Sequence, residues 1–135
     1  MPTSMGASME FRKQRVLLAD DEPDTCEVLS TMFQLLGHET RSVLRGRDVL
    51  RVTREFDPDL IVLDISLPDI SGYEVVRALK AERARPRYVA AATGWNRAQD
   101  LQRARQAGFD HHVLKPLQLS TLRQLLRLSE LQLAS

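Results

Sequence analysis

Chemically active side chains stand directly after several short apolar runs in this chain of 135 residues. In chain order they are Asp20, Asp21, Asp64, Thr93 and Lys115. A group of carboxylates with no histidine or cysteine beside it favours a hard cation that prefers oxygen ligands, and Mg²⁺ is the usual one in cells. A carboxylate can also act as a nucleophile, and phosphoryl transfer to it depends mainly on charge neutralisation and positioning. These residue types suggest a metal-assisted phosphorylation site, provided that the fold brings them together.

The run before Asp64 has the features of a buried strand. Residues 60–63 are all Leu, Ile or Val, and Pro58 and Pro68 bound the segment. Asp64 then lies at the carboxyl end of this strand, and ligands of open α/β sheets bind in the crevice beyond such ends. Taken alone, the segment leaves a second interpretation open, in which Asp64 only caps a loop.

The rest of the chain alternates between strand-like and helix-like patterns. Apolar residues recur at helical spacing from Val28 to Leu36, and Gly37 ends the pattern, so this helix should cover one face of a sheet. Further helices are expected at 48–56, from Tyr73 to a point before Pro86, at 97–107 as the loosest one, and at 120–133. Strands are expected at 15–19, 39–43 at the sheet edge, 60–64, 88–93 and 109–114. Five strands alternating with five helices predict an α/β fold with a doubly wound, five-stranded parallel sheet.

The last predicted helix carries more leucines than one buried face needs. One stripe holds Leu119, Leu122, Leu126 and Leu133, with Leu125 at its margin. Leu128 and Leu131 fall outside this stripe. They are either scattered surface residues or part of a docking or dimer face, and the sequence alone leaves both interpretations open.

Composition and charge limit the class of protein. A hydrophobic content of 43% and a charged content of 27% are ordinary for one globular domain. The net charge of +1 gives no reason to expect nucleic acid or an anionic membrane surface as a partner. The single cysteine, Cys26, fits a reducing compartment, and no stretch has the length of a signal-peptide core or a membrane span. We therefore expect a cytoplasmic protein in which residues 1–14 are a disordered or artificial leader and residues 15–135 form one domain.

From about Arg15 to the end of the last helix, the chain closely resembles the receiver (response regulator) domains of two-component signalling. The motifs that carry the resemblance are Asp20-Asp21, Asp64 with Pro68 and Gly72 behind it, Thr93, and Lys115-Pro116. Each motif is weak alone, but together they occur in the order and at the spacing of the family. The resemblance implies a flavodoxin-like sheet with the strand order 2-1-3-4-5.

The resemblance also implies a role for each site residue. Asp64 is expected to be the phosphoacceptor, and Mg²⁺ is expected to bind Asp21, Asp64 and the backbone carbonyl of Ser66, with Asp20 helping partly through water. Thr93 would donate a hydrogen bond to the phosphoryl group, and Lys115 would form an ion pair with it. The Lys115–Pro116 bond would be cis, which is chemically possible because proline is the residue before which cis peptide bonds occur. Ser66 and Trp95 would flank the phosphoryl group and tune its lifetime.

Three positions depart from the family pattern. Gly94 and Trp95 follow Thr93 where alanine usually comes next, and Gln118 stands where a small polar residue usually caps the last helix. His112 occupies the position, three residues before the site lysine, that usually holds Tyr or Phe. In the family that aromatic side chain turns inward when the threonine moves toward the phosphoryl group, so the expected switch pair here is Thr93 and His112. The variant resembles receivers attached to hybrid sensor kinases.

The implied partners are proteins. A histidine kinase or a histidine phosphotransfer protein would supply the phosphoryl group, and a downstream protein target would recognise the face formed by the helix at 97–107, the strand at 109–114 and the last helix. The domain would be a monomer or weak dimer. It would not be an enzyme beyond Mg²⁺-dependent self-phosphorylation from small donors and self-dephosphorylation.

Several alternatives compete with this interpretation. A hydrolase of the haloacid-dehalogenase type also uses a strand-end Asp with Mg²⁺, but its second Asp would stand where Ser66 stands. A pseudo-receiver scaffold is disfavoured because every acid, hydroxyl and cation of the site is present. His111 and His112 could be metal ligands, but neighbouring strand residues point to opposite faces. Trp95 could belong to the core, although its place just past a strand end favours a partly exposed position over the site.

Overall fold

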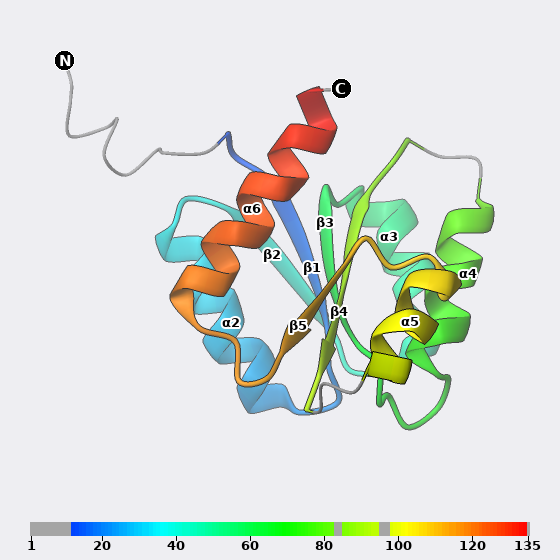
Figure 1. The fold of residues 1–135 in the computed structure, drawn as a ribbon. Coiled ribbons are helices and arrows are strands. Elements are labelled where there is room, and N and C mark those ends of the chain that lie inside the picture. Colours follow the sequence, from blue (N-terminus) through cyan, green and yellow to red (C-terminus); the bar gives the residue numbers. More distant parts are fainter. Residues whose placement is uncertain (1–11, 83–84, 95–97, 135) are drawn as a thin grey trace, which may run out of the picture.

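The computed structural model describes residues 12–82, 85–94 and 98–134, which form a three-layer α/β fold (Figure 1). The central sheet has five parallel strands in the order β2-β1-β3-β4-β5, which confirms the predicted fold class and strand order. Their bounds are Arg15–Ala19 for β1, Glu39–Val43 for β2, Leu60–Asp64 for β3, Tyr88–Thr93 for β4 and His111–Leu114 for β5. As predicted, β2 lies at an edge of this sheet.

Helices cover both faces of the sheet. The helices are α2 (Pro23–Leu35), α3 (Val49–Phe56), α4 (Gly72–Ala81), α5 (Ala98–Ala107) and α6 (Leu119–Ala134), with a short 3-10 helix, η1 (Gly46–Asp48), before α3. In Figure 1, α2 and α6 lie on one side of the sheet and α3, α4 and α5 on the other. No helix in the described part of the chain combines the length and apolar character needed to cross a bilayer.

Strand β3 is the centre of the molecule. All five of its residues are buried, and its four apolar residues alternate between two hydrophobic clusters. Leu60 and Val62 pack with α2 and α6, whereas Ile61 and Leu63 pack with α3, α4 and α5. Full burial of one such side chain contributes about 1.5–3 kcal/mol, so β3 is a rigid support for the aspartate at its end.

A neutral network of polar groups joins the amino end of the sheet to α6. Gln14 is fully buried just before β1, and its side-chain amide donates a hydrogen bond to the Leu126 carbonyl at 3.0 Å. The Ser129 hydroxyl donates to Gln14 Oε1 at 2.7 Å, and the Gln14 backbone N–H donates to His38 Nδ1 at 3.0 Å. These bonds satisfy polar groups that would otherwise be costly to bury.

Some predicted boundaries and faces were wrong. Strand β5 begins at His111, two residues later than predicted, because Phe109 instead donates its N–H to the Ala104 carbonyl at the end of α5. Residues 46–48 form η1, so the α-helix that was predicted to begin at Asp48 begins at Val49. In α6, Leu119 is 41% exposed and Leu125 is fully buried, because the buried face follows Leu122, Leu125, Leu126 and Ser129.

Candidate functional site

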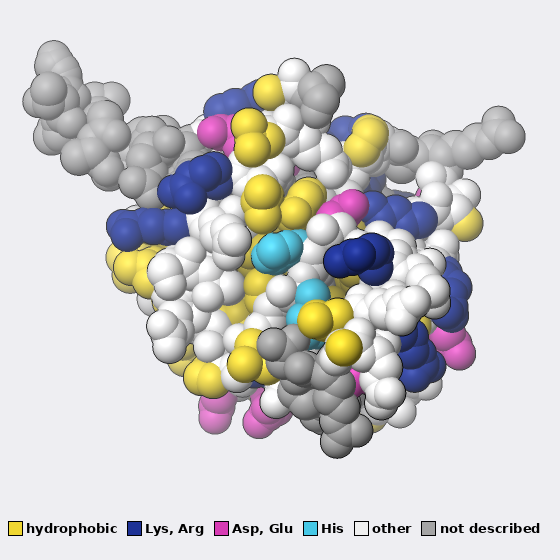
Figure 2. Space-filling model, viewed as in Figure 1, with side chains coloured by type: hydrophobic (Ala, Val, Ile, Leu, Met, Phe, Trp, Pro, Cys, Tyr) yellow, Lys and Arg dark blue, Asp and Glu magenta, His cyan; other side chains and the backbone are white. Residues whose placement is uncertain are grey.

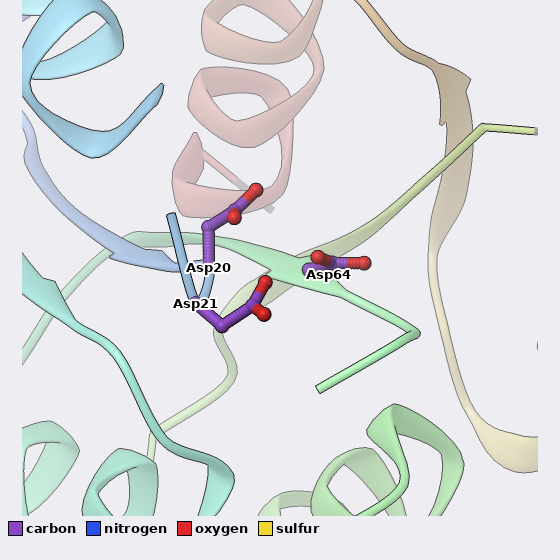
Figure 3. A group of neighbouring side chains, drawn as sticks. All are labelled: Asp20, Asp21 and Asp64. Atoms are coloured by element: carbon purple, nitrogen blue, oxygen red, sulfur yellow. The ribbon is translucent and has the colours of Figure 1, made fainter. Parts of the chain in front are cut away.

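Three carboxylates converge at the carboxyl end of the sheet (Figure 3). Asp64 is the last residue of β3, and Asp20 and Asp21 follow β1 directly. The two strands are parallel neighbours with Ala19 opposite Leu63, so the acids that follow come level with each other. One ligand atom from each acid lies within 4.8 Å of the others, and no other group of three or more acids, histidines or cysteines in the described residues is this close.

The acids differ in exposure. Asp20 and Asp64 are 5% and 4% exposed, whereas Asp21 is exposed at the rim. Asp20 Oδ1 accepts the Glu22 N–H at 2.9 Å, and Asp64 Oδ1 accepts the Ser66 N–H at 2.9 Å. These backbone bonds fix the rotation of both carboxylates, so that their second oxygens meet at a common cation.

That cation is Lys115, which follows β5. Its Nζ lies 2.8 Å from Asp20 Oδ2 and 3.0 Å from Asp64 Oδ2. Burial alone would lower the pKa of Lys115, but the hydrogen bonds to Asp20 and Asp64 outweigh burial and raise this pKa above its ordinary value. The Lys115 backbone N–H donates to the Thr93 carbonyl at 2.7 Å, and the Lys115–Pro116 bond is cis. Lysine therefore stays charged and bridges two of the three acids.

Thr93 completes the same edge of the sheet. It is the last residue of β4, it is 1% exposed, and it follows Ala92, which is paired with Asp64 across the β3–β4 ladder. The structure therefore brings the predicted residues Asp20, Asp21, Asp64, Thr93 and Lys115 to one end of the sheet. Trp95 lies outside the described residues.

The three acids fit a hard divalent cation. They supply oxygen ligands only, and a single lysine offsets part of their charge. Ser66 is exposed in the loop between β3 and α4, and this loop offers backbone carbonyls as additional oxygen donors. Like charges held this close repel each other unless a cation neutralises them, so the site is suited to taking up a metal ion.

An apolar groove of about 480 Å³ opens beside the acids, and the sequence alone did not indicate it. Its walls include Val28 and Leu29 of α2 and Leu117 after the cis bond, and it reaches Asp20, Asp64 and Lys115. Val28 was predicted to face the sheet, but it is 58% exposed because α2 turns its Leu29 and Phe33 side inward. Cys26 also lines this groove, and burial raises the pKa of its thiol.

Comparison with known proteins identifies the family. The sequence-family model of the response regulator receiver domain matches residues 16–127. The chain belongs to the response regulator receiver family. It is 32% identical over 108 residues to the DNA-binding response regulator MtrA of Mycolicibacterium smegmatis, which covers 80% of this chain and 46% of MtrA. It is also 32% identical over 108 residues to the probable transcriptional regulator ycf27 of Pyropia yezoensis, covering 80% of this chain and 44% of that protein.

Solved receiver structures share the fold of this chain. A CheY-like receiver domain from Methylobacillus flagellatus superimposes with a TM-score of 0.80 at 26% identity, covering 88% of this chain and 100% of that one. The receiver domain of Saccharomyces cerevisiae Ssk1, solved with the histidine phosphotransfer protein Ypd1, shares the fold with a TM-score of 0.82 at 21% identity, covering 93% and 94% of the two chains. This receiver spans about half the length of the curated relatives it matches.

His112 lies on β5 at the departure from the receiver pattern. The residue is half-buried, and its Nε2 atom is buried without a hydrogen-bond partner. Burial lowers the pKa of His112, the neighbouring His111 lowers it further, and Asp100 on α5 raises it in part. Asp100 Oδ2 is likewise buried without a partner. The contact between α5 and β5 therefore holds two unsatisfied polar atoms, each of which has a free-energy cost. Histidine side chains are visible in the middle of the surface that carries β5 (Figure 2).

Proposed function

We propose that this receiver accepts a phosphoryl group on Asp64 with Mg²⁺ bound beside it. A carboxylate oxygen of Asp64 attacks the phosphorus atom, the bond from phosphorus to the donor breaks, and the donor leaves with the electron pair. The observation that carries the proposal is the position of Asp64: nearly buried, bonded to Lys115, and within ligand distance of two further acids. Asp21, Asp64 and the Ser66 carbonyl would hold Mg²⁺ directly, and Asp20 would help through water.

Lys115 and Thr93 would stabilise the added charge. The phosphorylated form gains anionic oxygens beside Asp64, and the Lys115 ammonium already lies 3.0 Å from one Asp64 oxygen. Thr93 would donate its hydroxyl hydrogen to the phosphoryl group from the end of β4. Bound Mg²⁺ would neutralise charge on the oxygens at the start and end of the transfer.

The phosphorylated site would signal through the face formed by α5, β5 and α6. Movement of Thr93 toward the phosphoryl group would leave space behind it, and His112 would turn into that space as the neutral imidazole. The two unsatisfied atoms on His112 and Asp100 support this proposal. Buried polar groups without partners raise the free energy of the resting conformation, which brings it closer to that of an alternative conformation. Trp95 and Ser66 would set the lifetime of the phosphoryl group by controlling the approach of water.

The partners we propose are proteins. A histidine kinase or histidine phosphotransfer protein would donate the phosphoryl group, and the apolar groove beside Asp64 gives such a donor a surface to contact. A downstream protein would recognise the switched face. We propose that the domain itself acts in the cytoplasm as a monomer or weak dimer, without contacting nucleic acid or membrane. The matched region covers 46% of MtrA, which is a DNA-binding response regulator.

Intact mass measurement tests the assignment directly. Treatment with Mg²⁺ and acetyl phosphate should add one phosphoryl group to the wild type and none to Asp64→Asn. Asp57→Asn is the matched control, since Asp57 is an acid with a left-handed backbone (φ 54°) that asparagine tolerates, and it lies before β3 rather than after it. A phosphate gained by Asp64→Asn, or none gained by the wild type, would overturn the proposal.

A further inference from the structure

The loop between β3 and α4 is fixed at its base. It begins after Asp64 and contains Ser66, and the Gly72 N–H donates to the Ile65 carbonyl at 3.1 Å to close it. A Cβ atom at Gly72 would lie 2.7 Å from Ile65 Cα, so only glycine permits this close approach. The closure fixes where the loop starts and ends, but it leaves the tip to be positioned by other contacts.

Asp69 positions the tip of the loop. Its Oδ1 accepts the Gly46 N–H at 2.8 Å and its Oδ2 accepts the Arg47 N–H at 3.0 Å. These are the first two residues of η1, whose N–H groups have no partner within such a short helix. The hydrogen bond from Arg47, with that from Gly46, holds the pKa of the Asp69 carboxyl below its ordinary value. An exposed side chain thus makes a two-point contact with a segment more than twenty residues earlier in the chain.

Packing at Gly46 supports the same contact independently. Gly46 is buried, and a Cβ atom there would lie 3.2 Å from both the Cβ and the carbonyl oxygen of Ile70. The backbone of η1 therefore rests directly on the residue after Asp69. We refer to this contact of Asp69 and Ile70 with Gly46 and Arg47 as the loop clasp.

The loop clasp connects the two segments that carry the acids. On one side it holds the loop that follows Asp64 and includes Ser66. On the other side it holds η1, which follows β2, and the last residue of β2, Val43, accepts the Asp20 N–H at 3.1 Å. The β2–η1 connection is thus hydrogen-bonded to the segments after both β1 and β3.

We propose that Asp69 is a positioning residue for the metal site, holding the Ser66 carbonyl and the acids at the spacing that a divalent cation requires. The inference rests on the proposed function, because it concerns the same Mg²⁺ ion. Asp69 does not reach the acids itself; it acts through the loop clasp. Groups that hydrogen-bond a metal ligand directly change affinity by about 10–100-fold when removed, and Asp69 acts one step further away. We therefore expect a smaller change, about three- to ten-fold in the Mg²⁺ dissociation constant.

The test compares three variants by calorimetric titration with Mg²⁺ alone. Asp69→Ala removes both acceptors and should raise the dissociation constant by about three- to ten-fold. Asp69→Asn keeps one acceptor oxygen and should give an intermediate value. Glu74→Gln removes a charge from an exposed position in the first turn of α4 and should leave the value at that of the wild type.

Two further readouts separate positioning from a general loss of structure or charge. In metal-free protein, the amide hydrogens of Gly46 and Arg47 should exchange faster in Asp69→Ala, while those of β3 stay protected. The rate of phosphorylation by acetyl phosphate should fall at low Mg²⁺ and return to the wild-type value at saturating Mg²⁺.

The role of the loop clasp would be overturned by an unchanged Mg²⁺ dissociation constant in Asp69→Ala, or by an equal rise of this constant in Glu74→Gln. Binding of Mg²⁺ by the wild type would still uphold the proposed function in either case. Failure of the wild type itself to bind Mg²⁺ would refute the proposed function, and the role of Asp69 with it.

Discussion

At the amino end of the sheet, Gln14, Ser129 and His38 bury neutral polar groups that are hydrogen-bonded to each other and to the backbone. At the carboxyl end, three carboxylates face one lysine, and two of the acids are almost as deeply buried as Gln14. The hydrogen bonds of the first arrangement all lie within the protein and stabilise the fold. The second keeps an excess of negative charge, which lowers stability but provides a binding site for a cation and a phosphoryl group. Stability and chemistry are thus separated along the strands.

The largest expected effect is the loss of an acid at the carboxyl end. Asp21→Ala should weaken Mg²⁺ binding by more than the roughly 10–100-fold typical of supporting residues, because a direct ligand is removed. The melting temperature of metal-free protein should rise slightly, since like-charge repulsion is relieved. Titration and thermal unfolding measure the two effects, with Asp24→Ala on α2 as the control acid. Unchanged Mg²⁺ affinity would remove Asp21 from the ligand set.

A change at the amino end of the sheet should lower stability without affecting Mg²⁺ binding. Ser129→Ala leaves Gln14 Oε1 buried without its donor, which should lower the free energy of unfolding by about 1–3 kcal/mol. Mg²⁺ affinity should not change. Urea unfolding and Mg²⁺ titration test both statements, and Ser120→Ala in the exposed first turn of α6 is the control. A weakened Mg²⁺ site in Ser129→Ala would show that the two ends are not independent.

The switch should connect the carboxyl end to α5, β5 and α6. His112→Ala should leave the lifetime of the phosphoryl group nearly intact but reduce the change in hydrogen exchange in α6 that a phosphoryl mimic causes. An unaltered α6 response in His112→Ala would show that another side chain performs the switch.

Trp95→Ala should shorten the lifetime of the phosphoryl group, which dephosphorylation rates would measure. An unaltered rate in this variant would exclude a shielding role for Trp95.

The pH dependence of the switch follows from the lowered pKa of His112. If the inward position accepts only neutral imidazole, phosphorylation should lower this pKa further, and the active form should be less populated at about pH 5.5 than at about pH 8. Asp100→Asn should lower the His112 pKa in the resting form, because Asp100 is the group that raises it. NMR titration of the His112 ring, with and without a phosphoryl mimic, measures both shifts. Identical titration curves would contradict the proposed movement.

The smallest expected effect is the pH dependence of stability that His38 causes at the amino end of the sheet. Burial lowers the pKa of His38, although Glu130 and Asp59 raise it in part. Neutral His38 accepts the Gln14 N–H, so its contribution to stability is complete above the ordinary value of 6.5 and is lost as the pH falls through the lowered pKa of the folded state. Urea unfolding at about pH 7.5 and about pH 5 should therefore show a smaller loss of stability in His38→Asn than in the wild type. Equal losses would mean that His38 does not titrate in this range.

Local patterns were enough to predict the order of strands and helices and the edge where the acids meet, but not every boundary or buried face. Uninterrupted apolar runs before Asp20 and Asp64 mark buried parallel strands, and parallel strands bring their carboxyl ends to one edge. The contacts that hold this framework were not predictable in the same way. Gln14 and Ser129 are 115 positions apart, and Asp69 resembles an ordinary turn residue until η1 is placed beside it. Such pairs depend on how elements distant in sequence pack, and periodicity carries no information about that.

The edge of the sheet formed by β2 affects how the protein behaves at high concentration. No described strand pairs with the outer side of β2, so its unpaired N–H and C=O groups could recruit an unrelated chain and seed aggregation. Ion pairs along this strand oppose that: Arg15 with Glu39 at 3.3 Å, and Arg41 with Glu55 at 3.9 Å. An added strand would have to strip water from these charges. The ion pairs contribute little to folding because they are exposed, and we expect them to oppose pairing of β2 with another chain.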